Sequence, residues 1–253
     1  MKTVKLRGIE IGAGIPKICV PIVGTTKKEI LAQAQALRKL KADVAEWRVD
    51  WFEDAYDADA VVSVLSALRA ELEYTPLLTT FRTAAEGGEK AIEPAAYADL
   101  LIQAAESHFT DLIDVELFMG DAIVSEIIRK AHEAHVFVVA SSHEFEHTPA
   151  KEEILRRLRK MQDMDADILK VAVMPRSARD VLTLLAATEE MVSEYADRPV
   201  VTMSMAGTGV ISRISGEIFG SAMTFGSAGK ASAPGQLDAQ DLRAALTLLH
   251  RAL

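Results

Sequence analysis

The sequence predicts an α/β protein of the (β/α)8 barrel (TIM barrel) class, as a single domain over residues 1–253. Eight short runs rich in β-branched residues alternate with eight amphipathic segments of helix-forming composition. About 250 residues is the usual length of such a barrel. No Pro/Gly/Ser-rich linker or block of like charges divides the chain, so a domain boundary has no support.

The expected strands are short apolar runs bounded by turn-forming residues. They cover 17–23, 44–52, 77–82, 112–117, 136–141, 168–174, 200–205 and 222–226. The expected helices cover 27–40, 59–73, 94–106, 122–134, 149–161, 177–196, 210–218 and 238–251. A hairpin of residues 4–6 and 9–11 precedes the first strand and is expected to close the barrel floor. An open doubly wound sheet is the alternative, but it normally has fewer strands and a Gly-rich first turn.

Local signals set several helix boundaries. Thr148 and Pro149 resemble an N-cap followed by proline at the first helical position, which predicts a helix from residue 149. Ser177 and Asp180 have nearly the spacing and chemistry of a capping box. Gly216 lies inside the seventh expected helix and makes it the weakest of the set.

Composition and charge restrict the classes of function. The formal net charge of −9 argues against nucleic acid or an anionic membrane as the main partner. No apolar run reaches the roughly 18 residues of a spanning helix, and the N-terminal residues lack the apolar region of a signal peptide. The single cysteine, Cys19, suits a reducing compartment. We therefore expect a soluble, cytoplasmic protein.

The strand expected at 168–174 contains one charged residue, Lys170, among apolar ones. Strand alternation places Lys170, Ala172 and Met174 on one face, which we expect to be the barrel interior. The lysine could extend its ammonium to water along an apolar stem. Alternatively, a buried lysine that loses its proton is a nucleophile. The strand by itself does not decide between these two interpretations.

Polar side chains recur late in the expected strands, where a barrel places its active site. Glu46, Arg48 and Asp50 alternate and therefore share one face of their strand. Inward charges from several strands are costly in a dry core, so a polar pocket explains them better. For Asp114 and Glu116, a structural ion-pair role is equally compatible with the sequence. The other residues at strand ends are Arg82, Glu86, His143, Met203 and Met205.

Residues 143–147 match the H-E-x-x-H pattern of zinc proteases. That pattern binds zinc when a helix places both histidines on one face. Here it follows a strand directly and precedes Pro149, so His143 and His147 are not expected to share a face. We expect no metal site here.

Along nearly its full length the chain resembles the type I 3-dehydroquinate dehydratase family. The blocks that carry the resemblance are 46–50 (EWRVD), 81–82 (FR), 86–88 (EGG), 142–143 (SH), 170–172 (KVA), 204–206 (SMA), 211–213 (ISR) and 231–236 (ASAPGQ). The chain departs from enterobacterial members at Pro21, where a serine is common, and at Gly207, where a lysine is common. Both departures would alter the pocket rim rather than a catalytic group.

The resemblance implies syn elimination of water from 3-dehydroquinate to give 3-dehydroshikimate, the third step of the shikimate pathway. It implies that Lys170 forms an imine with the ketone, that His143 moves protons, and that Glu86 orients His143. It also implies a small-molecule substrate, a homodimer, and no cofactor or metal. The implied substrate-binding residues are Glu46, Arg48, Arg82, Arg213, Ser232, Gln236, Met203, Met205 and Phe225, and residues 228–236 are expected to form a lid.

Two other functions stay open on the sequence. A class I aldolase or transaldolase shares the imine-forming lysine but needs a phosphate site near the last two strands. A barrel that only binds a small carboxylate would form no imine at Lys170.

Overall fold

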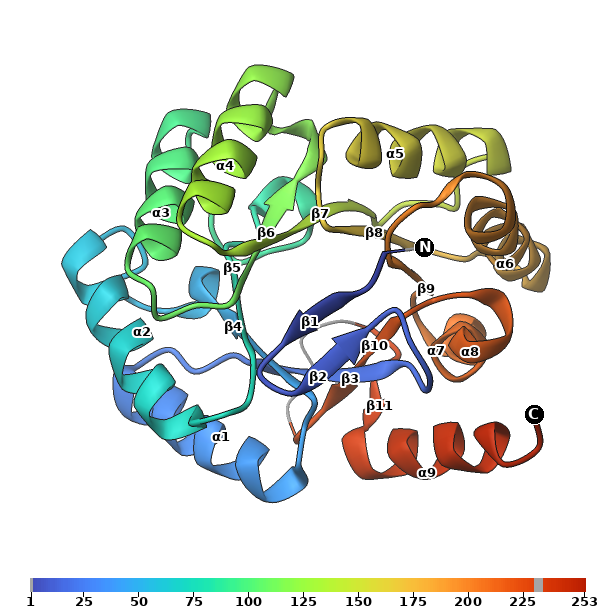
Figure 1. The fold of residues 1–253 in the computed structure, drawn as a ribbon, viewed down its shortest axis with the longest axis horizontal. Coiled ribbons are helices and arrows are strands. Elements are labelled where there is room, and N and C mark those ends of the chain that lie inside the picture. The colour runs from blue at the N-terminus through green and yellow to red at the C-terminus, as the bar shows by residue number, and fades with distance from the viewer. Residues whose placement is uncertain (1, 230–233) are drawn as a thin grey trace.

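The computed structural model describes residues 2–229 and 234–253. Eight parallel strands curl into a barrel in chain order (Figure 1). They are β3 (Lys17–Ile22), β4 (Val44–Arg48), β5 (Leu77–Thr80), β6 (Leu112–Glu116), β7 (Phe137–Glu144), β8 (Ile168–Val173), β9 (Val200–Ser204) and β10 (Met223–Ser227). A two-residue strand, β11 (Leu237–Asp238), pairs in parallel with β10 beyond the barrel.

The barrel closes between β9 and β10 through the residues just before β10. The Ala222 N–H donates to the Val200 carbonyl at 2.8 Å, and Val200 bridges in parallel to Ser221. The Ser221 hydroxyl also accepts the N–H of Thr202 at 3.0 Å. These contacts join β9 to the start of β10, and β10 pairs in turn with β3, so the eight strands form one ring and the predicted (β/α)8 barrel is confirmed.

The helices cover the outside of the barrel (Figure 1). Outward side chains of the strands, such as Leu169, Val171 and Val173 of β8, pack into the apolar layer between strands and helices. Burial of this layer is the main source of the fold's stability. The helices are α1 (Lys27–Leu40), α2 (Ala58–Leu72), α3 (Pro94–Glu106), α4 (Asp121–Glu133), α5 (Lys151–Asp163), α6 (Ala178–Glu190), α7 (Val210–Ile214), α8 (Gly216–Phe219) and α9 (Ala239–His250).

Two of the local predictions at helix ends have opposite outcomes. The capping box is confirmed, because the Ser177 hydroxyl accepts the N–H of Asp180 and the Asp180 carboxylate accepts the N–H of Ser177. The start at residue 149 is wrong, because α5 begins at Lys151 after Ala150. The Thr148 hydroxyl instead donates to the Met174 carbonyl at 3.0 Å, which ties this loop to the end of β8.

The seventh predicted helix is also corrected. It is broken at Ser215 into two short helices, and α6 is followed by a π-helical turn at Met191–Tyr195 rather than a continuous α-helix. Gly216 lies where an added Cβ would come 2.6 Å from the Ser221 carbonyl oxygen. The close approach to the strand-closing segment therefore requires glycine at this break.

The predicted N-terminal hairpin is confirmed. Strands β1 (Val4–Leu6) and β2 (Ile9–Ile11) pair antiparallel and cross the opening of the barrel nearest the viewer in Figure 1. Their apolar side chains join the cluster inside the barrel, and Arg7 in the turn pairs with Asp111 at 2.6 Å. The hairpin closes the end of the barrel where the strands begin.

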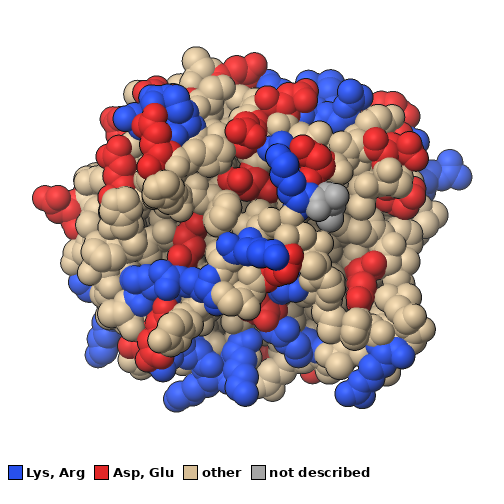
Figure 2. Space-filling model, viewed as in Figure 1, with Lys and Arg blue, Asp and Glu red and all other residues tan. Residues whose placement is uncertain are grey.

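Positive and negative side chains are interspersed on the hairpin face of the molecule (Figure 2). This face has no extended area of a single sign. Over the described residues, no helix combines the length and apolar character needed to cross a membrane.

Candidate active site

The interior side chains form layers that change from apolar to polar along the barrel. In barrels of this class, alternate strands contribute to one layer. Val44, Leu112, Ile168 and Met223, from β4, β6, β8 and β10, belong to the apolar interior cluster above the hairpin. Two residues further along the same strands come Glu46, Asp114, Lys170 and Phe225. The polar residues therefore lie toward the carboxyl ends of the strands, above an apolar floor.

Lys170 lies inside the barrel with 3% of its surface exposed. Its Nζ is 3.0 Å from Oδ2 of Asp114 and lies 4.6 Å from the centre of the Phe225 ring. The prediction that Lys170 and Ala172 face the interior is confirmed, and the interpretation of a lysine that extends to water is wrong. The charged partner of the ammonium is therefore the Asp114 carboxylate.

Arg82 joins several strands beside Lys170. Its guanidinium contacts Oδ1 of Asp114 at 2.6 Å and Oε1 of Glu116 at 2.8 Å, and it donates to the Ser141 hydroxyl at 3.1 Å. Burial favours the neutral form of Asp114, but Arg82 and Lys170 outweigh it and lower the pKa of this carboxyl to about 2. The ion-pair interpretation of Asp114 and Glu116 is therefore confirmed, and Asp114 also reaches the lysine.

His143 and Glu86 form a buried pair at the mouth of the barrel. Nδ1 of His143 lies 2.8 Å from Oε2 of Glu86, and the same oxygen accepts the backbone N–H of His143 at 2.9 Å. Burial and the positive charges of Arg82 and Lys170 lower the pKa of His143 well below its usual value. Burial also raises the pKa of Glu86 to about 8, against the effect of Arg82. The imidazole is thus neutral, which is the form that accepts a proton.

The second barrel strand supplies two further polar groups. Arg48 and Asp50 form a bidentate pair, with Nε to Oδ1 at 2.8 Å and Nη2 to Oδ2 at 2.7 Å. Glu46 does not pair with Arg48 and instead accepts the Thr80 hydroxyl at 2.9 Å. Asp50 thereby fixes the Arg48 guanidinium at the edge of the cavity.

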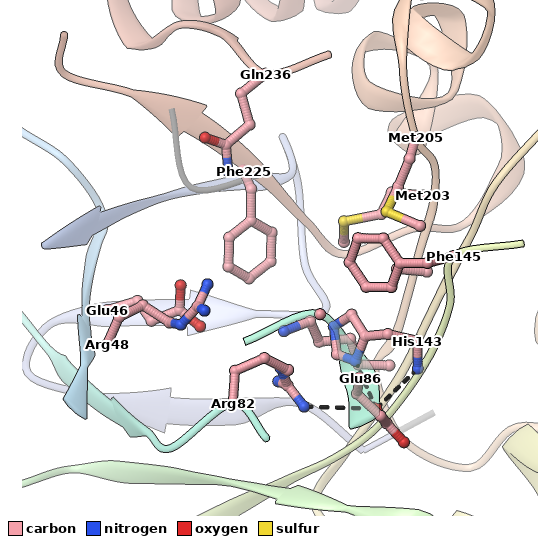
Figure 3. A pocket seen from close by; sticks show the side chains of 13 residues that line it. Glu46, Arg48, Arg82, Glu86, His143, Phe145, Met203, Met205, Phe225 and Gln236 are labelled. Carbon is pink, nitrogen blue, oxygen red and sulfur yellow. Dashed lines mark hydrogen bonds and ion pairs between the residues drawn. The ribbon is translucent and has the colours of Figure 1, made fainter. Parts of the chain in front are cut away.

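These side chains surround a cavity that opens to solvent (Figure 3). Figure 3 shows Glu46, Arg48 and Arg82 on one side, and Met203, Met205 and Phe145 on the other. The predicted site residues that line the cavity are Glu46, Arg48, Arg82, Glu86, His143, Lys170, Met203, Met205, Phe225 and Gln236. The structure brings them together from six strands and the loops that follow them.

Three lining residues were not predicted: Gly87, Phe145 and Ala172. Phe145 follows His143 by two positions, a spacing that could have placed it on the same side of the chain. A Cβ at Gly87, where φ is +83°, would overlap the Phe145 ring. Glycine at this position therefore lets the loop that holds Glu86 pack against Phe145.

Arg213 does not line the cavity directly but lies behind Met203. Its Nη1 is 3.9 Å from the Met203 sulfur, and its Nη2 donates to the Pro234 carbonyl at 3.1 Å. The side chain is buried, its Nε atom has no hydrogen-bond partner among the described residues, and burial lowers its pKa to about 10. A buried guanidinium of this kind favours the binding of an anion. Ser232 and the other residues of the expected lid from 230 to 233 lie outside the described residues.

The zinc-protease pattern has the wrong geometry. His143 and Glu144 belong to strand β7, and residue 147 lies in the loop before α5, so no helix aligns the two histidines. Across residues 2–229 and 234–253, no group of three or more His, Cys, Asp or Glu side chains is arranged to hold a metal ion. Neither of the two departures is a lining residue of the cavity: Pro21 is buried opposite Glu46, and an added Cβ at Gly207 would meet no atom of the described residues within 4 Å.

The chain was compared with known proteins. The family model for type I 3-dehydroquinase matches residues 18–252. The 3-dehydroquinate dehydratase of Bacillus subtilis (strain 168) is 51% identical over 251 residues, which are 99% of this chain and 98% of that protein. The enzyme so named from Salmonella typhimurium is 51% identical over 252 residues, 100% of both chains. A crystal structure of type I 3-dehydroquinate dehydratase from Clostridium difficile, with covalently modified comenic acid, has a TM-score of 0.97 at 50% identity and covers 100% of this chain and 99% of that one. The chain therefore belongs to the type I 3-dehydroquinase family.

Proposed function

We propose that this protein is a hydro-lyase that dehydrates 3-dehydroquinate to 3-dehydroshikimate through an imine at Lys170, the dehydration step of the shikimate pathway. The observation that carries the proposal is the buried Lys170 at the base of a polar cavity that a neutral histidine, His143, also lines. The family to which the chain belongs supports the choice of substrate.

Lys170 condenses with the C3 ketone of the substrate. The imine withdraws electrons from the adjacent carbon and makes the C2 proton easier to remove. His143 accepts that proton, because the neutral imidazole is the basic form, and later donates a proton to the leaving C1 hydroxyl. Glu86 holds His143 through one contact with its backbone N–H and one with its ring, and stabilises the imidazolium while it exists.

The remaining site residues bind the substrate in this proposal. Arg213 is a buried cation whose Nε has no partner within the part of the chain that the structure describes, which suits a carboxylate. Glu46, Arg48, Arg82, Ser232 and Gln236 contact the ring hydroxyls, and Met203, Met205 and Phe225 form an apolar wall. Excess apolar surface around a few polar groups is typical of small-molecule sites.

Borohydride reduction in the presence of 3-dehydroquinate tests the proposal directly. Wild type should gain the mass of the reduced adduct at Lys170, and absorbance of the conjugated enone product should appear without borohydride. Lys170→Ala should show neither. A wild-type protein that binds substrate with no adduct and no enone signal would be a binding protein, and the proposal would be wrong.

We also propose that the enzyme acts in the cytoplasm as a homodimer, as the family resemblance suggests. The lone buried Cys19 is compatible with a reducing compartment. Sedimentation equilibrium of the purified chain tests the oligomeric state, and a monomer at micromolar concentration would contradict the dimer.

A further inference from the structure

Asp114 lies beneath the cavity and has no part in the steps above. It is fully buried and touches three polar groups. Its Oδ1 accepts from Arg82 at 2.6 Å and from the Ser141 hydroxyl at 2.6 Å, while its Oδ2 faces Lys170 Nζ at 3.0 Å. Because Oδ1 already accepts hydrogen bonds from two donors, Oδ2 is the oxygen that pairs with the lysine ammonium.

We propose that Asp114 is a positioning residue that acts as the counter-ion of the protonated imine at Lys170, an inference that rests on the proposed function. The lysine ammonium must first release a proton to attack the ketone, and the imine takes up a proton once it has formed. Over the whole step a C=N bond replaces the C=O bond and the ketone oxygen leaves as water. The nitrogen keeps one hydrogen and one positive charge. The charge opposite Asp114 is therefore the same before and after condensation, and the remaining N–H still has Oδ2 as its acceptor.

The surroundings make such a counter-ion necessary. Burial disfavours any cation, and the guanidinium of Arg82 adds positive charge nearby. A neutral imine withdraws electrons less well than a protonated one, so loss of its proton would slow removal of the C2 hydrogen. Asp114 holds a pKa of about 2, so its negative charge persists over the working pH range.

The other ionisable groups around the pair do not replace Asp114. Burial raises the pKa of Cys19 and lowers that of His143, so both are neutral. Glu116 is paired with Arg82 and Thr83, and Glu46 accepts from Thr80. Among the described residues, Asp114 is the carboxylate that forms an ion pair with Lys170.

The test follows protonation of the imine that the enzyme forms with 3-dehydroshikimate. This imine is conjugated, and its protonated form absorbs at longer wavelength than its neutral form. In wild type it should stay protonated to a higher pH than the imine of the same ketone with butylamine in water. In Asp114→Asn the titration should move about 1–3 pH units lower, the size expected for loss of an adjacent opposite charge. Borohydride trapping at about pH 8 should slow about tenfold or more as a result.

Glu116→Gln is the matched control, because it removes a carboxylate from Arg82 without touching Lys170. It should leave the imine titration at the wild-type pH. If Asp114→Asn titrates as wild type does, the inference is wrong while the proposed function stands. If wild type forms no imine at all, both are wrong. Should Asp114→Asn fail to fold, the wild-type comparison still decides, since a protein imine that titrates at or below the butylamine imine would overturn the inference.

Discussion

Oε2 of Glu86 accepts the backbone N–H of His143 and lies 2.8 Å from Nδ1 of the same residue. One carboxylate oxygen therefore fixes both the strand end and the ring of the histidine. Turning the ring about χ1 would break the second contact, so Glu86 fixes the orientation of a ring that lines the cavity. The proposed acid–base chemistry depends on this arrangement.

Replacing His143 by alanine should separate imine formation from elimination. We expect His143→Ala to give a borohydride adduct at Lys170 but to lose about 10²–10⁴-fold in turnover, the usual contribution of a positioned acid–base group. Mass spectrometry and product absorbance measure the two effects. Turnover close to wild type would remove His143 from its proposed role.

Replacing Glu86 by glutamine should change how thermal stability depends on pH. The pKa of Glu86 is about 8 in the folded protein against 4.5 for the ordinary group, so the folded state binds more protons between these values. This contribution to stability is present below pH 4.5 and is lost as the pH rises through about 8. Glutamine stays neutral throughout. The Tm of Glu86→Gln relative to wild type should therefore be higher at about pH 9 than at about pH 5, by about 2–4 °C or more.

Glu89→Gln, in the same loop, is the control for that measurement. Its side chain is exposed, so its Tm should follow wild type at both pH values. If the difference in Tm between Glu86→Gln and wild type is the same at both pH values, burial does not raise the pKa of the Glu86 carboxyl.

Arg213→Lys should weaken substrate binding although it keeps the charge. A lysine cannot form the two parallel hydrogen bonds of a guanidinium to a carboxylate. We expect KM to rise about 10- to 100-fold, which corresponds to the loss of a charged hydrogen bond, with a smaller change in kcat. Arg243→Lys, a partly exposed position far from the cavity, should leave both constants unchanged. An unchanged KM in Arg213→Lys would mean that Arg213 does not bind the substrate carboxylate.

Gly88→Ala should displace the loop that holds Glu86. A Cβ there would overlap the backbone carbonyl of Arg82, which cannot move without shifting the guanidinium in the cavity. We expect a Tm lower by several degrees and a large loss of turnover, measured by calorimetry and product absorbance. Gly207→Ala meets no atom within 4 Å and should keep the Tm of wild type. Equal Tm values for the two variants would contradict the packing argument.

Much of the fold could be predicted because the barrel repeats a local pattern. Strand runs and helical segments alternate, and interior and exterior faces of β8 follow from strict alternation at Lys170, Val171 and Ala172. Helix boundaries were less predictable. The helix α5 begins at Lys151 rather than at the predicted Pro149. The Thr148 hydroxyl donates instead to the carbonyl of Met174, a residue distant in sequence.

The amino-acid sequence by itself determined the order of the strands and helices, the position of a lysine within an apolar strand, and the polar residues at strand ends, since these depend on spacing along the chain. Only the tertiary structure decided which charges meet. Asp114 lies 56 residues from Lys170, and Glu86 lies 57 from His143, yet each pair is in contact because β5, β6, β7 and β8 are neighbours in a closed ring and Glu86 lies in the segment after β5. Which charged side chains pair inside a barrel depends on the register of the strands and on the layer that each side chain occupies, and both are set when the ring closes.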